Sequence, residues 1–272
     1  MYDTGVAYPV ATHQQVRDSL EAITAPALMK ERMTARISAD TMGLLLYGSR
    51  ARDDYLPSSD WDVLRLSQAP HTTFSSGKIS VSTYTREQLE SASGSLFGTH
   101  LLRDGRIILD PNGLLAEVLS QLRPAVPEDL LATVRRYSVV LNMPANELAK
   151  HTAGLVRLGR YLLRTAIYAR TMRGGEPCFS VRDLAYRFSD PALAILLASN
   201  PEVTGPPTRE VLIELISRLT REIGALPTTE YKSLESLAIG FWNCDRNISA
   251  LSIRAAREDG DIDYSDLPKV LL

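Results

Sequence analysis

This 272-residue chain contains two aspartates separated by one residue, Asp60 and Asp62, whose side chains and spacing suit a reactive or metal-binding site. They open an apolar run that ends at Leu66 and is typical of a buried strand. Residues two apart on a strand point the same way, so both carboxylates are expected on one face, at one edge. Side by side they repel unless a cation lies between them, and their oxygens suit a hard ion such as Mg²⁺. The pair therefore predicts a metal site.

A second feature, the dipeptide Gly48-Ser49, follows an earlier apolar run, Leu44 to Tyr47, and precedes the acid pair by ten polar turn residues. Because glycine has no side chain in the way, backbone N–H groups at this turn can approach a phosphate closely. A phosphate cradle beside a metal-binding acid pair is the minimum equipment for phosphoryl or nucleotidyl transfer. A Walker phosphate loop is excluded, since no Gly-Lys-Ser/Thr follows the glycine.

This segment resembles the DNA polymerase beta-like nucleotidyltransferases, and most closely their minimal and aminoglycoside-modifying members. The shared pattern is strand-Gly-Ser-(ten residues)-Asp-x-Asp, and this sequence matches the family at Gly48, Ser49, Ala51, Arg52, Ser59, Asp60 and Asp62. The motif covers under a tenth of the chain. Asp53 stands where family members often have glycine, which we interpret as a change in turn geometry.

The resemblance implies roles for the matched residues. Asp60 and Asp62 would be catalytic and would hold Mg²⁺, with Mn²⁺ as the alternative ion. Gly48 and Ser49 would bind the phosphates of a nucleoside triphosphate, with Arg50 or Arg52 as helpers. ATP is the expected triphosphate, used as a substrate.

One strand departs from the family pattern. Lys78 to Thr85 alternates as a half-buried strand does, and related enzymes usually begin it with a third acidic residue, a metal ligand or base. The matching position here is Ser80, or Ser82 in another register, and neither serine accepts a proton at neutral pH. A base from a neighbouring segment could come from Asp104, Asp110 or His100.

A second acid pair, Asp261 and Asp263, has the same spacing as the first. It lies in a Gly/Asp-rich tail after a predicted helix, without a strand and Gly-Ser before it. We interpret it as a solvated tail.

Composition bounds the function further. The net charge of −2 gives no global basic field of the kind that drives nonspecific nucleic-acid binding. Two cysteines, Cys178 and Cys244, form neither a zinc spacing nor a disulfide framework. With no signal peptide and no apolar run long enough to cross a bilayer, the chain is expected to be cytoplasmic.

The order of predicted elements indicates two domains and the α+β class. Residues 1–123 are expected to form a mixed sheet with helices on one face, for which the resemblance implies a nucleotidyltransferase fold, and residues 124–272 are expected to form an all-helical bundle. The prolines Pro124 and Pro127 mark the join. Thr12 and Thr85 each begin a capping box with a glutamine three residues later. The active site is expected in the cleft between the domains.

Long helices dominate the second half. Asn146 to Arg173 predicts one helix, and so does Thr229 to Arg257. The last helix carries an apolar seam through Phe241 and Cys244, expected to pack on its own bundle, with a dimer seam as the alternative. Trp242 beside it is expected to be structural. The oligomeric state stays open.

The first of these long helices carries an arginine stripe, which consists of Arg157, Arg160 and Arg164 with Tyr168. We predict a solvated face, and the alternative is a lining of the interdomain cleft that binds triphosphate or an anionic acceptor. His151 is expected to be packed or hydrogen-bonded rather than catalytic.

Two functions from different classes remain. The first is an enzyme that transfers a nucleoside monophosphate to a hydroxyl of a small-molecule acceptor, with RNA or protein as alternative acceptors. The second is a nucleotide-binding regulatory or partner-modifying protein with weakened catalysis. The serine at the third acidic position supports the second.

Overall fold

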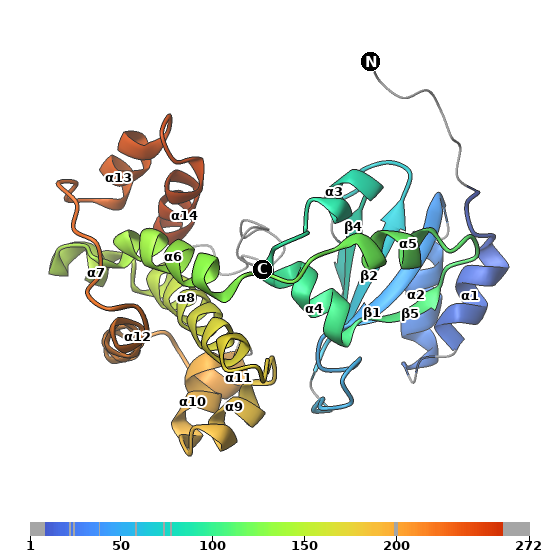
Figure 1. Ribbon diagram of the computed structural model, residues 1–272, viewed down its shortest axis with the longest axis horizontal. Coiled ribbons are helices and arrows are strands. Elements are labelled where there is room, and N and C mark those ends of the chain that lie inside the picture. The colour runs from blue at the N-terminus through green and yellow to red at the C-terminus, as the bar shows by residue number, and fades with distance from the viewer. Residues whose placement is uncertain are drawn as a thin grey trace. The chain divides into compact units, whose positions relative to one another are not determined.

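The computed structural model describes residues 9–257, except residues 22, 24, 38, 58, 73, 77, 199 and 200. The chain divides into two compact units, Met1–Pro124 and Ala125–Leu272 (Figure 1). The second acid pair, Asp261 and Asp263, lies outside the described residues.

The first unit is built on a five-stranded mixed sheet with the strand order β3-β4-β2-β1-β5. β2 runs antiparallel to β1 and parallel to β4, and the outer strands β3 and β5 pair antiparallel with β4 and β1. The α+β class with a mixed sheet is therefore confirmed. The strands are β1 Thr41–Tyr47, β2 Trp61–Ser67, β3 Phe74–Ser76, β4 Ile79–Tyr84 and β5 Arg106–Leu109.

Apolar residues at alternate positions give the sheet two faces to bury. One face belongs to a core that contains Leu44, Leu46 and Val63 together with residues of α1 (His13–Glu21) and α2 (Ala27–Ile37). The predicted interruption of the first helix by Pro26 is confirmed, since it lies between α1 and α2.

The second face of the sheet carries helices as well. The ring of Phe97, in α4 (Leu96–Asp104), meets that of Tyr47 edge-on with centroids 5.8 Å apart. A Cβ on Gly43 would lie 3.0 Å from Leu115 in α5 (Leu114–Gln121), so α5 packs closely on β1. The sheet is thus enclosed on both sides, whereas the sequence predicted helices on one face only. This enclosure fixes the positions of the residues at the sheet's edge.

Both predicted capping boxes are confirmed. Thr12 and Gln15 exchange side-chain to backbone hydrogen bonds of 2.8 and 3.2 Å at the start of α1. Thr85 and Gln88 do the same at 3.0 and 3.3 Å at the start of α3 (Arg86–Glu90). In each box two of the unsatisfied N–H groups at a helix start are bonded by side chains of the same turn.

Arg65 is a charged residue inside the sheet, in β2, with 4% of its surface exposed. Its guanidinium donates to Thr41 Oγ1 at 2.9 Å and to the Ala39 carbonyl, and it forms an ion pair with Asp40. Burial lowers the pKa of Arg65, and the Asp40 carboxylate acts in the opposite direction. These bonds tie β2 to the segment that enters β1.

All the regular elements described in the second unit are helices (Figure 1). Its central element is α8, which is buried along most of its length and packs against α6, α12 and α14. The elements are α6 Pro127–Tyr137, the 3₁₀ helix η1 Ser138–Leu141, α7 Ala145–Lys150, α8 Thr152–Arg173, α9 Val181–Arg187, α10 Pro191–Leu197, α11 Pro201–Thr204, α12 Arg209–Ile223, α13 Leu234–Phe241 and α14 Arg246–Ala256.

Both long helices predicted from the sequence are divided in the structure. His151 separates α7 from α8 with non-helical dihedrals, φ −114° and ψ 27°. Asp245 caps α14 by accepting the N–H groups of Asn247 and Ile248, and such a cap favours a new helix start over continuation. The apolar seam predicted along the last helix is therefore interrupted at its middle, where Cys244 is exposed. Trp242, which was expected to be structural, is 61% exposed rather than packed.

At Arg160 and Arg164 the arginine stripe of α8 is not the solvated face that the sequence predicted, and its alternative role in binding an anion stays a prediction. Arg160 is buried and donates from Nε to the Leu196 carbonyl at 3.0 Å, and Arg164 donates to the Leu197 carbonyl. Both acceptors are in the last turn of α10, where helical carbonyls lack partners within the helix. Tyr168 donates to the Phe179 carbonyl at 3.1 Å. The stripe therefore holds neighbouring segments against α8.

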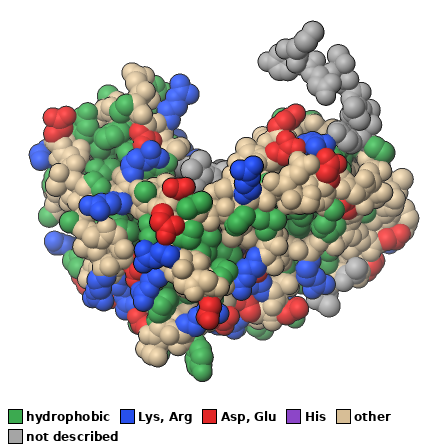
Figure 2. Space-filling model, viewed as in Figure 1, with side chains coloured by type: hydrophobic (Ala, Val, Ile, Leu, Met, Phe, Trp, Pro, Cys, Tyr) green, Lys and Arg blue, Asp and Glu red, His purple; other side chains and the backbone are tan. Residues whose placement is uncertain are grey.

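Charged side chains of both signs are intermingled over the helical unit on the face shown in Figure 2. That distribution fits the net charge near zero. Within the described part of the chain, no helix is both long and apolar enough to cross a membrane.

Asp40→Asn should lower the free energy of unfolding by about 2 to 4 kcal/mol, because Arg65 would keep its buried charge without a counter-charge. Asparagine tolerates the positive φ of 48° at this position, so the backbone is little affected. His71→Ala is the matched control, since His71 contacts the same carboxylate at 2.8 Å but is 43% exposed. It should lose less than about 1 kcal/mol. Urea denaturation measures both, and equal losses would contradict the role of the buried pair.

Candidate active site

The pairing of β1 with β2 brings the predicted phosphate turn to the predicted acid pair. Tyr47, the last residue of β1, is the partner of Asp62 in the antiparallel register. Gly48 follows with φ +74°, and a Cβ built on it would lie 2.6 Å from Asp62 Oδ2. The Asp62 carboxylate therefore lies directly against the backbone of Gly48. The neighbouring strands β1 and β2 thus bring a carboxylate and the turn together in one site.

Asp60 and Asp62 flank Trp61, the first residue of β2. Trp61 is 4% exposed and belongs to the core beneath α1 and α2. Its N–H donates to the Lys78 carbonyl at 2.7 Å, so the backbone here is already held beside the start of β4. Since alternate residues of an extended segment point to opposite sides, the two aspartates lie on the side away from that core.

The electrostatics at Asp60 favour a cation. Its side chain is exposed at the rim, but the surrounding protein removes part of its water. This partial burial raises the pKa of Asp60, while the positive charges of Lys78 and Arg50 act in the opposite direction. Asp60 and Asp62, on either side of Trp61, supply carboxylate oxygens, which are the ligands that a hard divalent ion prefers. The residues present therefore fit Mg²⁺.

Gly48 begins a tight turn rather than an open loop. Its carbonyl accepts the N–H groups of Ala51 and Arg52 at 3.2 and 3.3 Å. The N–H groups of Ser49 and Arg50 therefore stand at the start of a helix-like turn, the position that binds anions at helix N-termini.

Asp53, at the end of the same turn, has a φ of +60°, the left-handed conformation that glycine adopts readily. Aspartate visits this region more readily than most residues, so the chain forms the turn without a glycine here. The expected change in turn geometry stays a prediction.

Arg50 stabilises the polar loop that leads to the acid pair. Its guanidinium lies 4.0 Å from the ring centroid of Tyr55 and 4.5 Å from that of Trp61, and it donates to the Ser59 carbonyl at 3.0 Å. These contacts span the loop from its turn to the residue before Asp60. Arg50 thus sets the loop's conformation and places a positive charge near the carboxylates.

The position expected to carry a third acid is occupied by Ser80. In the parallel pairing of β2 with β4, Ser80 is the partner of Asp62 and Ser82 is the partner of Leu64. Ser80 is half-buried, whereas Ser82 is buried, with its hydroxyl 3.4 Å from that of Tyr47. Of the two registers that the sequence left open, the structure has the one with Ser80 beside Asp62.

The other candidate bases have structural partners. Asp104 forms ion pairs with Arg52 at 3.3 Å and with Arg103 at 3.7 Å. Burial raises the pKa of Asp104, and Arg52 is the largest opposing influence. Asp110 accepts two N–H groups from the first turn of α5, at 3.1 and 2.8 Å. His100 lies half-buried on α4. The contacts of Asp104 and Asp110 therefore stabilise the fold.

The sequence did not identify Tyr47 as part of this region. It reads as the end of an apolar strand, but the register places it opposite Asp62, with its hydroxyl near Ser82. An aromatic residue with a polar tip at a strand end, directly before Gly-Ser, was the available indication.

Comparisons with known proteins give a weak likeness in structure and none in sequence. No family model matches the chain, and no curated protein matches it in sequence at a significant level. A crystal structure of spectinomycin adenyltransferase AAD(9) from Enterococcus faecialis with ATP and spectinomycin is similar at a TM-score of 0.36 and 13% identity. The match covers 91% of this chain and all of that one. A TM-score at this level does not establish a common fold.

Gly48→Ala should displace the Asp62 carboxylate, because the new Cβ would lie 2.6 Å from Oδ2. Alanine would also be strained at a positive φ, at about 1 to 2 kcal/mol. Gly94→Ala is the matched control, since its φ is +77° and a Cβ there would meet nothing within 4 Å. Urea denaturation should show a larger loss for Gly48→Ala than for Gly94→Ala. Equal losses would mean that the carboxylate is not held against the turn.

Proposed function

We propose that this chain is a nucleotidyltransferase that moves a nucleoside monophosphate from ATP to a hydroxyl group of a small-molecule acceptor. The observation that carries the proposal is the contact of the Asp62 carboxylate with Gly48, which joins an acid pair to the Gly48 turn. In the reaction the acceptor hydroxyl loses its proton to solvent water and its oxygen bonds to the α-phosphorus, while the bond from that phosphorus to the bridging oxygen breaks and pyrophosphate leaves.

Each residue near the turn has a role in this proposal. Asp60 and Asp62 would hold Mg²⁺ or Mn²⁺, which when bound supplies charge neutralisation for the triphosphate. The N–H groups of Ser49 and Arg50 would bind outer phosphate oxygens, because they stand at the start of the Gly48 turn. The Arg50 side chain keeps the loop in place through its contacts with Tyr55 and Ser59.

The acceptor class rests on charge. The net charge is −2, and basic and acidic side chains are intermingled on the face of the helical unit in Figure 2. Nucleic-acid binding uses a basic patch or stripe, and the face in Figure 2 shows charges of both signs intermingled instead, which favours a small-molecule acceptor. RNA and protein acceptors are separate outcomes of the experiment below.

A second candidate function has its own observation. Ser80, the residue beside Asp62 on β4, cannot act as a base at neutral pH. A protein that binds nucleotide and acts as a regulator, with slow turnover, would need the acid pair and the turn but not a third acid.

The decisive experiment incubates the full chain with α-labelled ATP, Mg²⁺ or Mn²⁺, and cell extract, and then separates small molecules, RNA and protein. We expect label in the small-molecule fraction together with pyrophosphate release. Nucleotide binding without transfer would support the regulator instead. Label in RNA or protein would keep the chemistry and replace the acceptor.

Asp60→Asn and Asp62→Asn should each abolish the Mg²⁺-dependent part of ATP binding, because the ion would lose one of its two carboxylates. Calorimetric titration of ATP with Mg²⁺, repeated with a chelator, measures this. If neither variant changes the Mg²⁺-dependent affinity, the metal does not bind at this pair.

The same Asp60→Asn variant has a distinct effect without metal. A raised pKa means that the folded chain disfavours the charged Asp60, so this group's contribution to stability falls as the pH rises above its usual value of 3.8. Asparagine does not ionise, so the variant avoids this loss of stability. It should therefore be at least as stable as the native chain near neutral pH in chelator. The difference should vanish as the pH falls towards 3.8.

Ser80→Asp should raise pyrophosphate release, because it places a base beside Asp62 in the observed register. General-base assistance contributes roughly 10²- to 10⁴-fold. The gain should require Asp60 and Asp62. Ser80→Asn is the matched control, of similar size but unable to accept the proton, and it should bring no gain. An equal rate in the native chain and both variants would show that the base lies elsewhere.

A further inference from the structure

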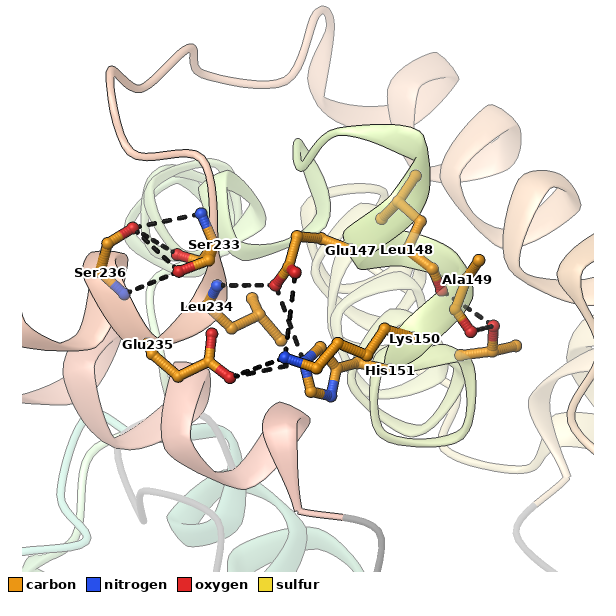
Figure 3. Close-up of polar contacts among 10 residues, drawn as sticks. Glu147, Leu148, Ala149, Lys150, His151, Ser233, Leu234, Glu235 and Ser236 are labelled. Atoms are coloured by element: carbon orange, nitrogen blue, oxygen red, sulfur yellow. Dashed lines mark hydrogen bonds and ion pairs between the residues drawn. The ribbon is translucent and has the colours of Figure 1, made fainter.

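A second cluster of potential ligands lies in the helical unit, at the junction of α7 with α8 and the start of α13 (Figure 3). It comprises Glu147, His151 and Glu235, of which Glu147 and His151 are buried, at 6% and 7% exposure. Figure 3 shows the side chains of these residues and of Lys150 converging between the two helical segments. The cluster is separate from the acid pair at Asp60 and Asp62.

The imidazole ring of His151 makes no hydrogen bond to any residue that the structure describes. Its Nε2 lies 3.7 Å from Glu147 Oε2 and 3.8 Å from Glu235 Oε1, too far for a hydrogen bond. Both of its ring nitrogens are buried without a hydrogen-bond partner among the described residues. The sequence predicted a packed or hydrogen-bonded histidine, and the structure shows a packed one only. An unsatisfied buried imidazole directed at two carboxylates requires a physical explanation.

We propose that Glu147, His151 and Glu235 form a binding site for a divalent transition-metal ion of the Zn²⁺ type. One ligand atom from each residue lies within 4.8 Å of the other two. Zn²⁺ binds histidine nitrogen and carboxylate oxygen at about 2.0 to 2.2 Å, so tetrahedral ligand atoms lie about 3.4 Å apart. Two of the three separations exceed that by only a few tenths of an ångström. Water would complete the coordination.

The donor set selects the class of ion. An imidazole nitrogen with two carboxylates suits Zn²⁺ and its neighbours, whereas Mg²⁺ prefers oxygen ligands and keeps its water. Glu147 Oε2 is also anchored, because it accepts the Leu234 N–H at 3.2 Å. That hydrogen bond orients the carboxylate through the same oxygen that faces His151, and a bond of this kind fixes the position of a metal ligand.

Lys150 is the competitor for the site. Its Nζ lies 3.1 Å from Glu235 Oε1 and 4.0 Å from Glu147 Oε1, so it supplies positive charge where the metal would bind. Its side chain is 55% exposed and ends a flexible stem, and it can therefore move into solvent when the ion enters. Metal affinity should accordingly rise when this lysine is removed.

Zn²⁺ titration of the full chain by calorimetry, and by competition with a chromophoric chelator, tests the site. Glu235→Gln and His151→Gln should each weaken binding by more than the roughly 10- to 100-fold that loss of an outer-shell partner costs. Lys150→Met should tighten it. His71→Ala is the matched control, a partly exposed histidine beside Asp40, and should leave the affinity unchanged.

Two further measurements make the result unambiguous. Co²⁺ should give the visible absorption of a nitrogen- and oxygen-ligated ion in the native chain and lose it in Glu235→Gln, whose exposed position avoids a folding defect. The Zn²⁺ affinity should persist in Asp62→Asn, so the outcome is independent of the proposed transferase activity. Absence of Zn²⁺ binding, affinity unchanged in both cluster variants, or affinity lost in Asp62→Asn would each overturn the proposal.

Discussion

The contact between the Asp62 carboxylate and the backbone of Gly48 sets the geometry on which the candidate active site depends. It follows from the ladder of β1 and β2, in which Tyr47 is the partner of Asp62. A side chain at position 48 would occupy the space of the carboxylate, and the positive φ adds a second reason for glycine. The direction of the turn, and so the N–H groups at its start, is fixed by the same pairing.

Much of the first unit could be predicted from its sequence because the determining interactions are local. The apolar Trp61 between two aspartates indicates that they share a side, and threonine with glutamine three residues on indicates a helix start. The caps and four of the strands agree, whereas the short outer strand β3 was not predicted. The roles of Asp60, Asp62 and the Gly48 turn stay predictions, since the fold constrains positions and not reactions. The backbone conformation of Asp53 could not be predicted, because it is not apparent from the side chain.

The second unit was harder to predict because its polar residues act over long separations. Arg160 and Arg164 have the spacing of a solvated stripe, yet their acceptors are carbonyls at the end of another helix, more than 30 residues away. Glu147 meets the start of α13 at a separation of 87 residues. Periodicity gives the face on which a residue lies but not the element that covers it. The break at His151 was missed for a related reason, since apolar spacing continues across it.

The strand order has a consequence for how the candidate active site would be lost. β2 and β1 are interior strands, flanked by β4 on one side and β5 on the other. Amides in such strands exchange with solvent chiefly when the whole unit opens, whereas short outer strands such as β3 fray first. Asp62 and the residue before Gly48 belong to these interior strands. Partial opening at the margins of the sheet would therefore leave this contact in place, and its loss would accompany cooperative unfolding of the unit.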